Sequence, residues 1–297
     1  MAGPRLNVEP PVFTPQPYGL ISVVQPVDDG TSHWQNGVTW QSRCMSPMGA
    51  ATYDECIAVT GSGEAPPEPS VKTENVELID RGGTPFTVYA KFDCSPVGVA
   101  NAQKIATDAL NRSESWQVER VFWTGLVDGK PIAFPHLAAA TEVDDAQGIM
   151  LQSAATIVTS SPVDIATGLG LLEAQLGNCY NGVGVIHVPV GVLPTLDAHG
   201  LVKPKNGIMQ TLNGNLVAVG AGYTGSSPAG VAAPVGQSWM YATGAIMMRR
   251  SAVKIAPMRE SIDRRNNTVE MIAERTYVLG WDCCHAAVLV DTGVSVN

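Results

Sequence analysis

The sequence predicts an α+β fold, in which helices and strands occupy separate stretches of the chain. Two stretches, 95–123 and 161–176, carry apolar residues at helical spacing. The C-terminal stretch, 240–297, is rich in short strand-like runs. The first 60 residues instead combine closely spaced prolines with little helical periodicity, which indicates an extended arm rather than a folded core.

Composition limits the classes of function. The 297 residues suffice for one large domain or two small ones, and the charged fraction of 15% lies below the ~25% of an average soluble domain. A chain with so few charges either buries much of itself or covers its apolar surface with partners. The net charge of −9 argues against a dedicated nucleic-acid binder, which usually carries a basic surface. No apolar run has the length of a membrane span, and we expect no signal peptide.

The N-terminal arm contains one predicted turn. Asn36-Gly37 lies between Trp34 and Trp40, in a strand-like stretch. This dipeptide has the composition of a two-residue hairpin turn, because both positions tolerate a positive φ. We therefore expect a hairpin here, with the two tryptophans exposed on an isolated subunit.

A second, longer hairpin is predicted after the arm. Residues 61–70 are rich in glycine and proline and form a loop tip. Two strand-like runs follow at 71–79 and 85–92, with a turn at Asp80–Gly83 between them. Two strands with polar ends are expected to project from the body of the protein.

Capping signals define the two helices. Ser95-Pro96 opens the first, whose apolar stripe continues to Trp123. Ser161–Asp164 has the form of a capping box for the second, which Gly177 and Asn178 are expected to end. A continuous apolar run at 182–190 follows and is typical of a central strand. Further elements are expected as a short helix at 193–198 and as strands at 215–219, 240–248, 253–256, 268–272, 276–281 and 286–290.

Several short sequence motifs, taken in order along the chain, carry a resemblance to a known family. They are "SPVDIATGLGLLEAQLG", "GVGVIHVPVGVLPTL", "GIMQTLNGNLVAVGAGYTG", the tyrosine-x-threonine-glycine step of "MYATGAIMMRRSAVKIAP" and the basic "AER" strand. In this order the chain resembles a major capsid protein of tailed bacteriophages, with the Hong Kong 97-like fold, of the kind found in phages of actinobacteria. The resemblance implies an N-terminal arm at 1–60, a projecting two-stranded loop at 61–93, a peripheral domain with a long spine helix at 94–160, an axial domain at 161–239 and return strands at 240–297.

The same resemblance implies a function and partners. The subunit is expected to assemble with itself into hexamers and pentamers of an icosahedral shell that encloses double-stranded DNA. A portal and a separate scaffolding protein are implied as further partners, with weak, non-specific contacts to DNA and no membrane. The implied location is the virion capsid, assembled in the host cytoplasm. An encapsulin-like nanocompartment shell, a tail-tube protein and a decoration protein remain alternatives.

Inter-subunit contacts are expected from aromatic and basic side chains. Arg249-Arg250 and Arg264-Arg265 are the most basic spots, and they serve either as paired surface groups or as contacts to neighbours and DNA phosphates. The lysines of the projecting loop are a second set, because some relatives cross-link such a lysine to an asparagine. Ordinary polar contacts are the simpler expectation. The full set is Trp34, Trp40, Lys72, Lys91, Arg249, Arg250, Arg264 and Arg265, with Asn266 and Asn267 as possible cross-link partners.

A nucleotide site is the first enzymatic alternative. Residues 220–225 match the glycine pattern of a dinucleotide fingerprint, but the breakers that follow leave no helix to hold a pyrophosphate. A glycine-rich loop at the tip of the axial domain is the simpler interpretation. No cofactor and no metal are therefore predicted.

Thiol chemistry is the second alternative. Cys283, Cys284 and His285 hold potential metal ligands, but adjacent cysteines on a strand point to opposite faces. A Cys–His hydrolase would need Cys94 or Cys179 beside His136 or His187, and no local signature supports it. We expect reduced, mostly buried thiols and a satisfied core histidine at His187.

Overall fold

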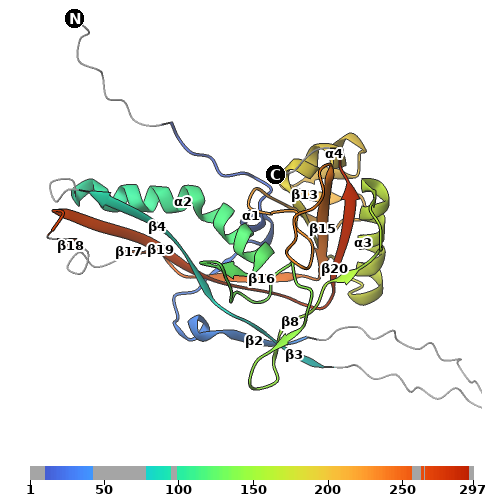
Figure 1. Cartoon of the computed structure of the whole chain (residues 1–297), viewed down its shortest axis with the longest axis horizontal. Helices are drawn as coiled ribbons and strands as arrows, with labels where there is room; N and C mark the ends of the chain where they lie inside the picture. The colour runs from blue at the N-terminus through green and yellow to red at the C-terminus, as the bar shows by residue number, and fades with distance from the viewer. Residues whose placement is uncertain (1–10, 43–77, 95–98, 256–261, 264, 294–297) are drawn as a thin grey trace, which may run out of the picture.

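Helix α2 (Val99–Thr124) lies along one face of a six-stranded sheet (Figure 1). The computed structural model describes residues 11–42, 78–94, 99–255, 262–263 and 265–293. The 26 residues of α2 span about 39 Å, at ~1.5 Å per residue. They confirm the predicted spine helix from Val99 to its C-terminal end, whereas its predicted start at Ser95 lies outside the described residues. The serines near its middle do not interrupt it, because the Ser113 hydroxyl donates back to the Ala109 carbonyl at 3.0 Å.

The six-stranded sheet is organised around one long strand, β19 (Thr268–Trp281). Four of the other five strands pair directly with β19, and β1 pairs with β16. Two separate strands were expected in this stretch, but the chain stays extended through Arg275, whose side chain reaches Glu114 of α2 at 2.7 Å. The remaining strands are β1 (Val27–Asp28), β4 (Phe86–Cys94), β16 (Ile246–Arg250), β17 (Lys254–Ile255) and β18 (Ile262–Asp263).

An eight-stranded mixed sheet forms the second half of the molecule. Its order is β10-β20-β15-β11-β14-β13-β12, and β9 also pairs with β20. The expected single strand at 240–248 is two strands, because the chain turns at Gly244, where a Cβ would overlap the Asp282 carbonyl. The strands are β9 (Thr156–Ile157), β10 (Val163–Asp164), β11 (Val185–Pro189), β12 (Val202–Lys205), β13 (Ile208–Thr211), β14 (Leu216–Gly220), β15 (Gln237–Thr243) and β20 (His285–Asp291).

Both faces of the eight-stranded sheet are buried, as the continuous apolar run of β11 predicts. Ile186 and Met240 belong to the core under helices α3 (Ile165–Cys179) and α4 (Leu193–Ala198). Their neighbours Val185 and Tyr241 belong to the core around α2. Successive side chains of a strand point to opposite faces, so a strand covered on both sides has no polar face.

The start of α3 differs from the predicted capping box. Asp164, rather than Ser161, is the N-cap, and its carboxylate accepts from the amides of Ala166 and Thr167 at 3.0 Å each. The helix also continues past Gly177 to Cys179. The short helix α4 lies at the predicted residues, after a 3-10 turn at Val190–Val192.

The N-terminal region contains more regular structure than an extended arm. Helix α1 (Leu20–Val24) and a 3-10 helix at His33–Asn36 precede β2 (Val38–Ser42). The predicted hairpin around Asn36-Gly37 is wrong, because the residues before the turn are helical and β2 pairs instead with β3 (Ile79–Gly83).

The predicted second hairpin also needs correction, because β2 and β3 form an antiparallel pair. The predicted turn at Asp80–Gly83 lies inside β3, and the predicted strand at 85–92 falls in β4, which pairs with β19. The residues between the two strands, 43–77, lie outside the described part of the chain. A four-stranded sheet is completed by β7 (Val143–Asp144) and β8 (Met150–Gln152), and β5 (Leu126–Val127) pairs with β6 (Lys130–Pro131).

Two glycines of α3 provide a matched test of this packing. A Cβ at Gly168 would overlap the Val290 side chain of β20, whereas a Cβ at Gly170 would meet nothing within 4 Å. We expect Gly170→Ala to raise the free energy of unfolding by about 1 kcal/mol through helix propensity. Gly168→Ala should lower it by up to about 2 kcal/mol, because an overpacking cost of about 1–3 kcal/mol outweighs that gain.

Urea unfolding of both variants measures the difference. Effects of the same sign would contradict the docking of α3 on β20.

Candidate assembly interface

The residues around α1 attach the N-terminal region to the body of the subunit. Leu20 is fully buried and Val23 is 5% exposed, both in the core around α2. The Val219 amide of β14 donates to the Tyr18 carbonyl at 2.8 Å. Part of the predicted arm therefore belongs to the folded core, and deleting residues 1–40 would open that core.

A buried carboxylate holds three segments together at this point. Glu119 of α2 is 1% exposed, and its two oxygens accept from the amides of Leu20 at 3.1 Å and Gly222 at 3.0 Å. The Ser115 hydroxyl donates to the same group at 3.1 Å. Burial raises the pKa of Glu119, and the amide and hydroxyl donors oppose that shift.

The glycine-rich loop after β14 is part of this contact. A Cβ at Gly222 would overlap the Trp116 carbonyl of α2, so only glycine permits the close approach. The loop is thus buried against α2. The sequence led us to expect it at the tip of the axial domain, and that expectation is wrong. No helix begins at the loop, as the breakers that follow it in the sequence predict.

Strand β1 is attached by two ion pairs. Arg249 contacts Asp29 at 2.6 Å, and the Arg250 guanidinium contacts both oxygens of Asp28 at 2.6 and 3.4 Å. The hydrogen bond from Arg250 lowers the pKa of Asp28. Both arginines therefore have partners within the same chain, although their side chains are partly exposed and an inter-subunit role stays a prediction.

The two tryptophans of the arm have different environments. Trp34 is 5% exposed and its indole donates to the Asp29 carbonyl at 3.4 Å, so its expected exposure on the isolated subunit is wrong. Trp40 is half-buried and covers Gly280 of β19, where a Cβ would overlap the indole ring. The Trp40 ring therefore packs the N-terminal region against β19 of its own subunit.

Two further basic residues of the predicted contact set, Lys91 and Arg265, lie at one end of the six-stranded sheet. Lys91 of β4 pairs with Glu270 of β19 at 2.7 Å and with Asp93 at 3.7 Å. Arg265 is exposed in the turn before β19, beside Asn266 and Asn267. Lys72 and Arg264 lie outside the described residues.

The core between α2 and the six-stranded sheet also contains charge. Glu114 is 7% exposed and accepts hydrogen bonds from Arg275 at 2.7 Å and from the Tyr277 hydroxyl. Burial and the Glu114 charge raise the pKa of Tyr277, which keeps the phenol a donor. This network fixes the rotation of α2 over β19, because a buried carboxylate without these donors would be costly.

In the described part of the structure, the histidine and cysteine side chains of the thiol alternative have other partners. His187 is fully buried and its ring contacts the hydroxyls of Tyr223 and Thr243, both at 3.0 Å, as expected of a core histidine. The expected reduced thiol at Cys179 is instead joined to Cys284 in a disulfide. The Cys94 side chain lies outside the described part of the structure.

Cys283 and Cys284 face opposite ways, although they lie in the turn between β19 and β20 and not on the expected strand. The sulfur of Cys283 lies 3.1 Å from the Ser42 hydroxyl, whereas that of Cys284 faces α3. Among the residues described, no group of three histidine, cysteine or acidic side chains is arranged to hold a metal ion. None of the described helices has the length and apolar character needed to cross a membrane.

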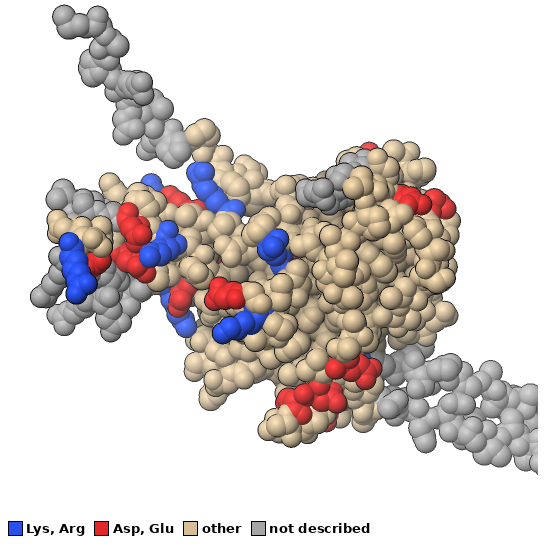
Figure 2. All heavy atoms as spheres, in the orientation of Figure 1, with Lys and Arg blue, Asp and Glu red and all other residues tan. Residues whose placement is uncertain are grey.

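The eight-stranded half presents a surface with few charges. Figure 2 shows charged side chains gathered over α2, β4 and β19, whereas the face over the eight-stranded sheet is largely uncharged. Exposed apolar residues occur in its loops, including Val231 at 63% and Val235 at 84%. Across 161–243 the charged residues are Asp164, Glu173, Asp197, Lys203 and Lys205.

A second apolar surface lies beside α2. Tyr89, Trp116 and Leu126, here called the spine patch, are 49%, 46% and 43% exposed and line a hollow of about 320 Å³. A larger groove of about 660 Å³ adjoins it through Leu126 and Arg120. Exposed aromatic side chains in hollows of this kind are typical of protein interfaces.

Replacing Glu119 tests the attachment of the arm. Glu119→Gln offers one acceptor oxygen where the carboxylate offers two, so we expect a loss of about 1–3 kcal/mol in unfolding free energy. Hydrogen exchange should accelerate at the amides of Leu20 and Gly222. Ser115→Ala is the matched control, with a loss of about 1 kcal/mol, because only a hydroxyl donor is removed. Unchanged protection in Glu119→Gln would contradict the three-way contact.

The buried histidine predicts a pH dependence of stability. Burial, assisted by nearby His285, lowers the pKa of His187 to about 3, while an unfolded chain's histidine titrates near ~6.5. Below pH ~6.5 the unfolded state binds more protons, so stability falls by about 1.4 kcal/mol per pH unit from this residue. Burial lowers the pKa of His285 to about 4, which adds a loss of the same sign.

Urea unfolding between pH 7 and pH 5 measures this slope. His187→Gln should reduce it, and His199→Gln at an exposed position should leave it unchanged. A slope that is the same in all three proteins would contradict the neutral core histidine.

The chain was compared with protein-family models, curated proteins and solved structures, and only solved structures match it. No protein-family model and no curated protein matches the chain. Among solved structures, a capsid chain of an empty GTA particle matches with a TM-score of 0.55 and 11% identity, over 99% of this chain and 96% of that one.

Two phage structures give similar values. The capsid of Ralstonia phage GP4 matches with a TM-score of 0.54 and 10% identity, over 99% of this chain and 96% of that one. A chain of Mycobacterium phage Ogopogo matches with a TM-score of 0.51 and 12% identity, over 97% and 96%. At such identities the likeness concerns the fold. The chain therefore has the α+β, Hong Kong 97-like capsid fold that the order of its elements predicts.

Proposed function

We propose that this chain is the major capsid protein of a tailed phage, a structural subunit rather than an enzyme. The observation that carries the proposal is the match to capsid chains over nearly the full length of both partners. Fold alone does not fix function, so the surfaces of this chain supply the second argument. Two of them, the charge-poor face of the eight-stranded half and the spine patch, leave apolar area without cover in one subunit.

The proposed assembly consists of hexamers and pentamers of this chain in an icosahedral shell. Heterologous contacts close each ring, and the rings then tile. Interfaces of roughly 2,000–5,000 Å² are expected for permanent contacts of this kind. A charge-poor ring surface suits such contacts, because charged residues are depleted from the centres of interfaces.

The proposed partners follow from the same role. The shell would enclose double-stranded DNA through weak, non-specific contacts, which suits a net charge of −9. A portal and a separate scaffolding protein complete the list, and assembly takes place in the host cytoplasm before the protein resides in the virion. The eight basic and aromatic contact residues named above are part of this proposal where their side chains are accessible.

Electron microscopy of the overexpressed protein tests the proposal. We expect closed polyhedral particles, because the uncovered apolar surfaces make the dispersed subunit unfavourable. Stacked rings or tubes would indicate a tail-tube protein, and a stable small oligomer would contradict a shell role. Nucleic acid in particles purified from infected or induced cells separates a capsid from a nanocompartment that holds proteins.

A variant of the spine patch sharpens this test. Trp116→Ala removes an exposed ring that Arg120 covers at 5.3 Å, and a buried interface tryptophan contributes about 2 kcal/mol or more. We expect the concentration needed for assembly to rise at least about 30-fold, with little change in the thermal midpoint of the dispersed subunit. Trp116→Phe is the control and should assemble. Normal assembly of Trp116→Ala would remove the spine patch from the proposed interfaces.

A further inference from the structure

Two cysteines far apart in the sequence meet where the two halves of the molecule join. Cys179 is the last residue of α3, and Cys284 lies in the turn between β19 and β20. Their Cα atoms are 5.5 Å apart across 105 residues of sequence, and a disulfide joins them. This Cα separation lies near the middle of the range that disulfides adopt.

The backbone holds both sulfurs in place independently of the bond between them. Cys284 has a φ of 58°, and the Gly244 amide donates to the carbonyls of Cys283 and Cys284 at 3.1 and 3.3 Å. The sulfurs of Cys179 and Cys284 lie 3.0 and 3.7 Å from the same acceptor, the Gln175 carbonyl. Two thiols would therefore have a hydrogen-bond acceptor here, so the pair fits the reduced state as well as the oxidised one.

Access to the pair is also adequate for exchange. Both residues are only partly buried, and α3 lies on the outer face of the eight-stranded sheet. Thiol–disulfide exchange needs a thiolate that a small disulfide can reach. Partial exposure at the end of a helix meets this requirement, whereas a sulfur in the core of the sheet would not.

We propose that Cys179 and Cys284 are a reversible redox pair, open as a dithiol in a reducing compartment and closed by glutathione disulfide or a similar small disulfide. This goes beyond the proposed shell function and does not depend on it, because both sulfurs belong to one chain.

The reaction is a two-step exchange. One thiolate of the pair attacks a sulfur of glutathione disulfide, forms a mixed disulfide and releases one glutathione thiolate. The second thiolate of the pair then attacks the protein sulfur of the mixed disulfide, closes the Cys179–Cys284 bond and releases the second glutathione. Two electrons and two protons pass from the cysteines to glutathione, so one glutathione disulfide becomes two glutathione molecules.

The closed bond would stabilise the junction between the sheets. It ties α3, in the layer outside the eight-stranded sheet, to the turn that links β19 of one sheet with β20 of the other. A cross-link over so long a loop restricts the unfolded chain strongly. Closing it should raise the thermal midpoint by at least about 5 °C.

The adjacent cysteine requires a control. Cys283 is disulfide-bonded too, and its sulfur lies on the opposite face, next to Ser42. A change in midpoint on adding reductant to the wild type therefore reports on more than one bond. Variants of Cys179 and Cys284 separate the contributions, because neither substitution touches the sulfur of Cys283.

The experiment equilibrates the full-length protein in buffers of reduced and oxidised glutathione, traps free thiols with N-ethylmaleimide and maps the linked peptides by mass spectrometry. We expect a peptide pair linked through Cys179 and Cys284 in oxidising buffer and two alkylated cysteines in reducing buffer. Thermal midpoints of wild type, Cys179→Ser, Cys284→Ser and the double variant are measured in both buffers. The three variants should share one smaller response to oxidation.

Two results would overturn the proposal. One is alkylation of Cys179 and Cys284 in oxidising buffer as complete as in reducing buffer. The other is a wild-type response of the midpoint no larger than that of the variants. Neither result bears on particle formation, so the proposed redox pair and the proposed shell function are tested independently of each other.

Discussion

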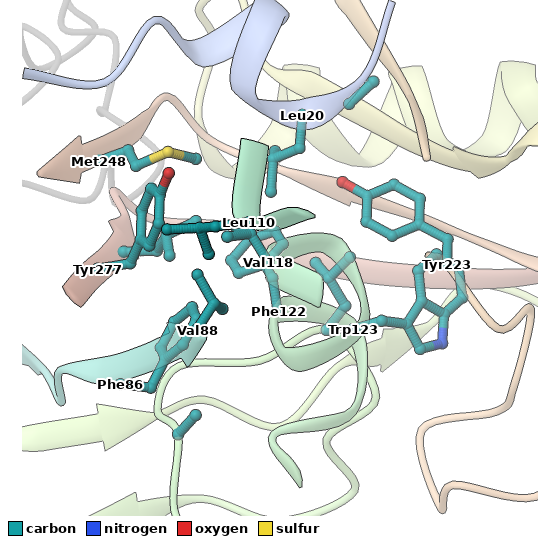
Figure 3. Close-up of a cluster of buried hydrophobic side chains, with 14 of the residues drawn as sticks. Leu20, Phe86, Val88, Leu110, Val118, Phe122, Trp123, Tyr223, Met248 and Tyr277 are labelled. Carbon is teal, nitrogen blue, oxygen red and sulfur yellow. The ribbon is translucent and has the colours of Figure 1, made fainter. Parts of the chain in front are cut away.

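An aromatic contact at the C-terminal end of α2 is the constraint on which the rest of the structure depends. Trp123 packs on Tyr241 of the eight-stranded sheet with ring centroids 4.9 Å apart, and its indole donates to Ser226 at 3.0 Å. The preceding Phe122 packs on Trp281 of the six-stranded sheet at 5.7 Å. Two adjacent side chains of one helix thus contact both sheets. Figure 3 shows Phe122 and Val118 beside side chains of β4, β16 and β19, with Trp123 next to Tyr223.

This contact makes the two sheets share one core and leaves other surfaces for partners. The residues around α2 come from both sheets and from α1, whereas α3 and α4 cover the far face of the eight-stranded sheet with a core of their own. Glu119 and the two arginine–aspartate pairs then attach the N-terminal region to this body. Among the described residues, the charge-poor face and the spine patch leave apolar side chains exposed, and the proposed self-assembly would cover them.

Much of the fold could be predicted because periodicity and capping are local signals. The apolar run of β11 indicated a strand buried on both faces, and α2, α4 and the body of α3 followed from spacing. Contacts between residues far apart in the sequence give no local signal of this kind. Asn36-Gly37 has hairpin composition, yet β2 pairs with β3 some forty residues later. The partners of Arg249 and Arg250, the meeting of Cys179 with Cys284, and the burial of the glycine-rich loop on Glu119 likewise depend on three-dimensional contacts that the order of residues does not reveal.

Calorimetric unfolding of the dispersed full-length chain tests the shared core most directly. If α2 joins both sheets through Phe122 and Trp123, the sheets unfold together, and a single transition is predicted in which the calorimetric and van 't Hoff enthalpies agree. Two resolved transitions, one for each sheet, would contradict the account, since they would mean that each half is stable without the aromatic contact between them.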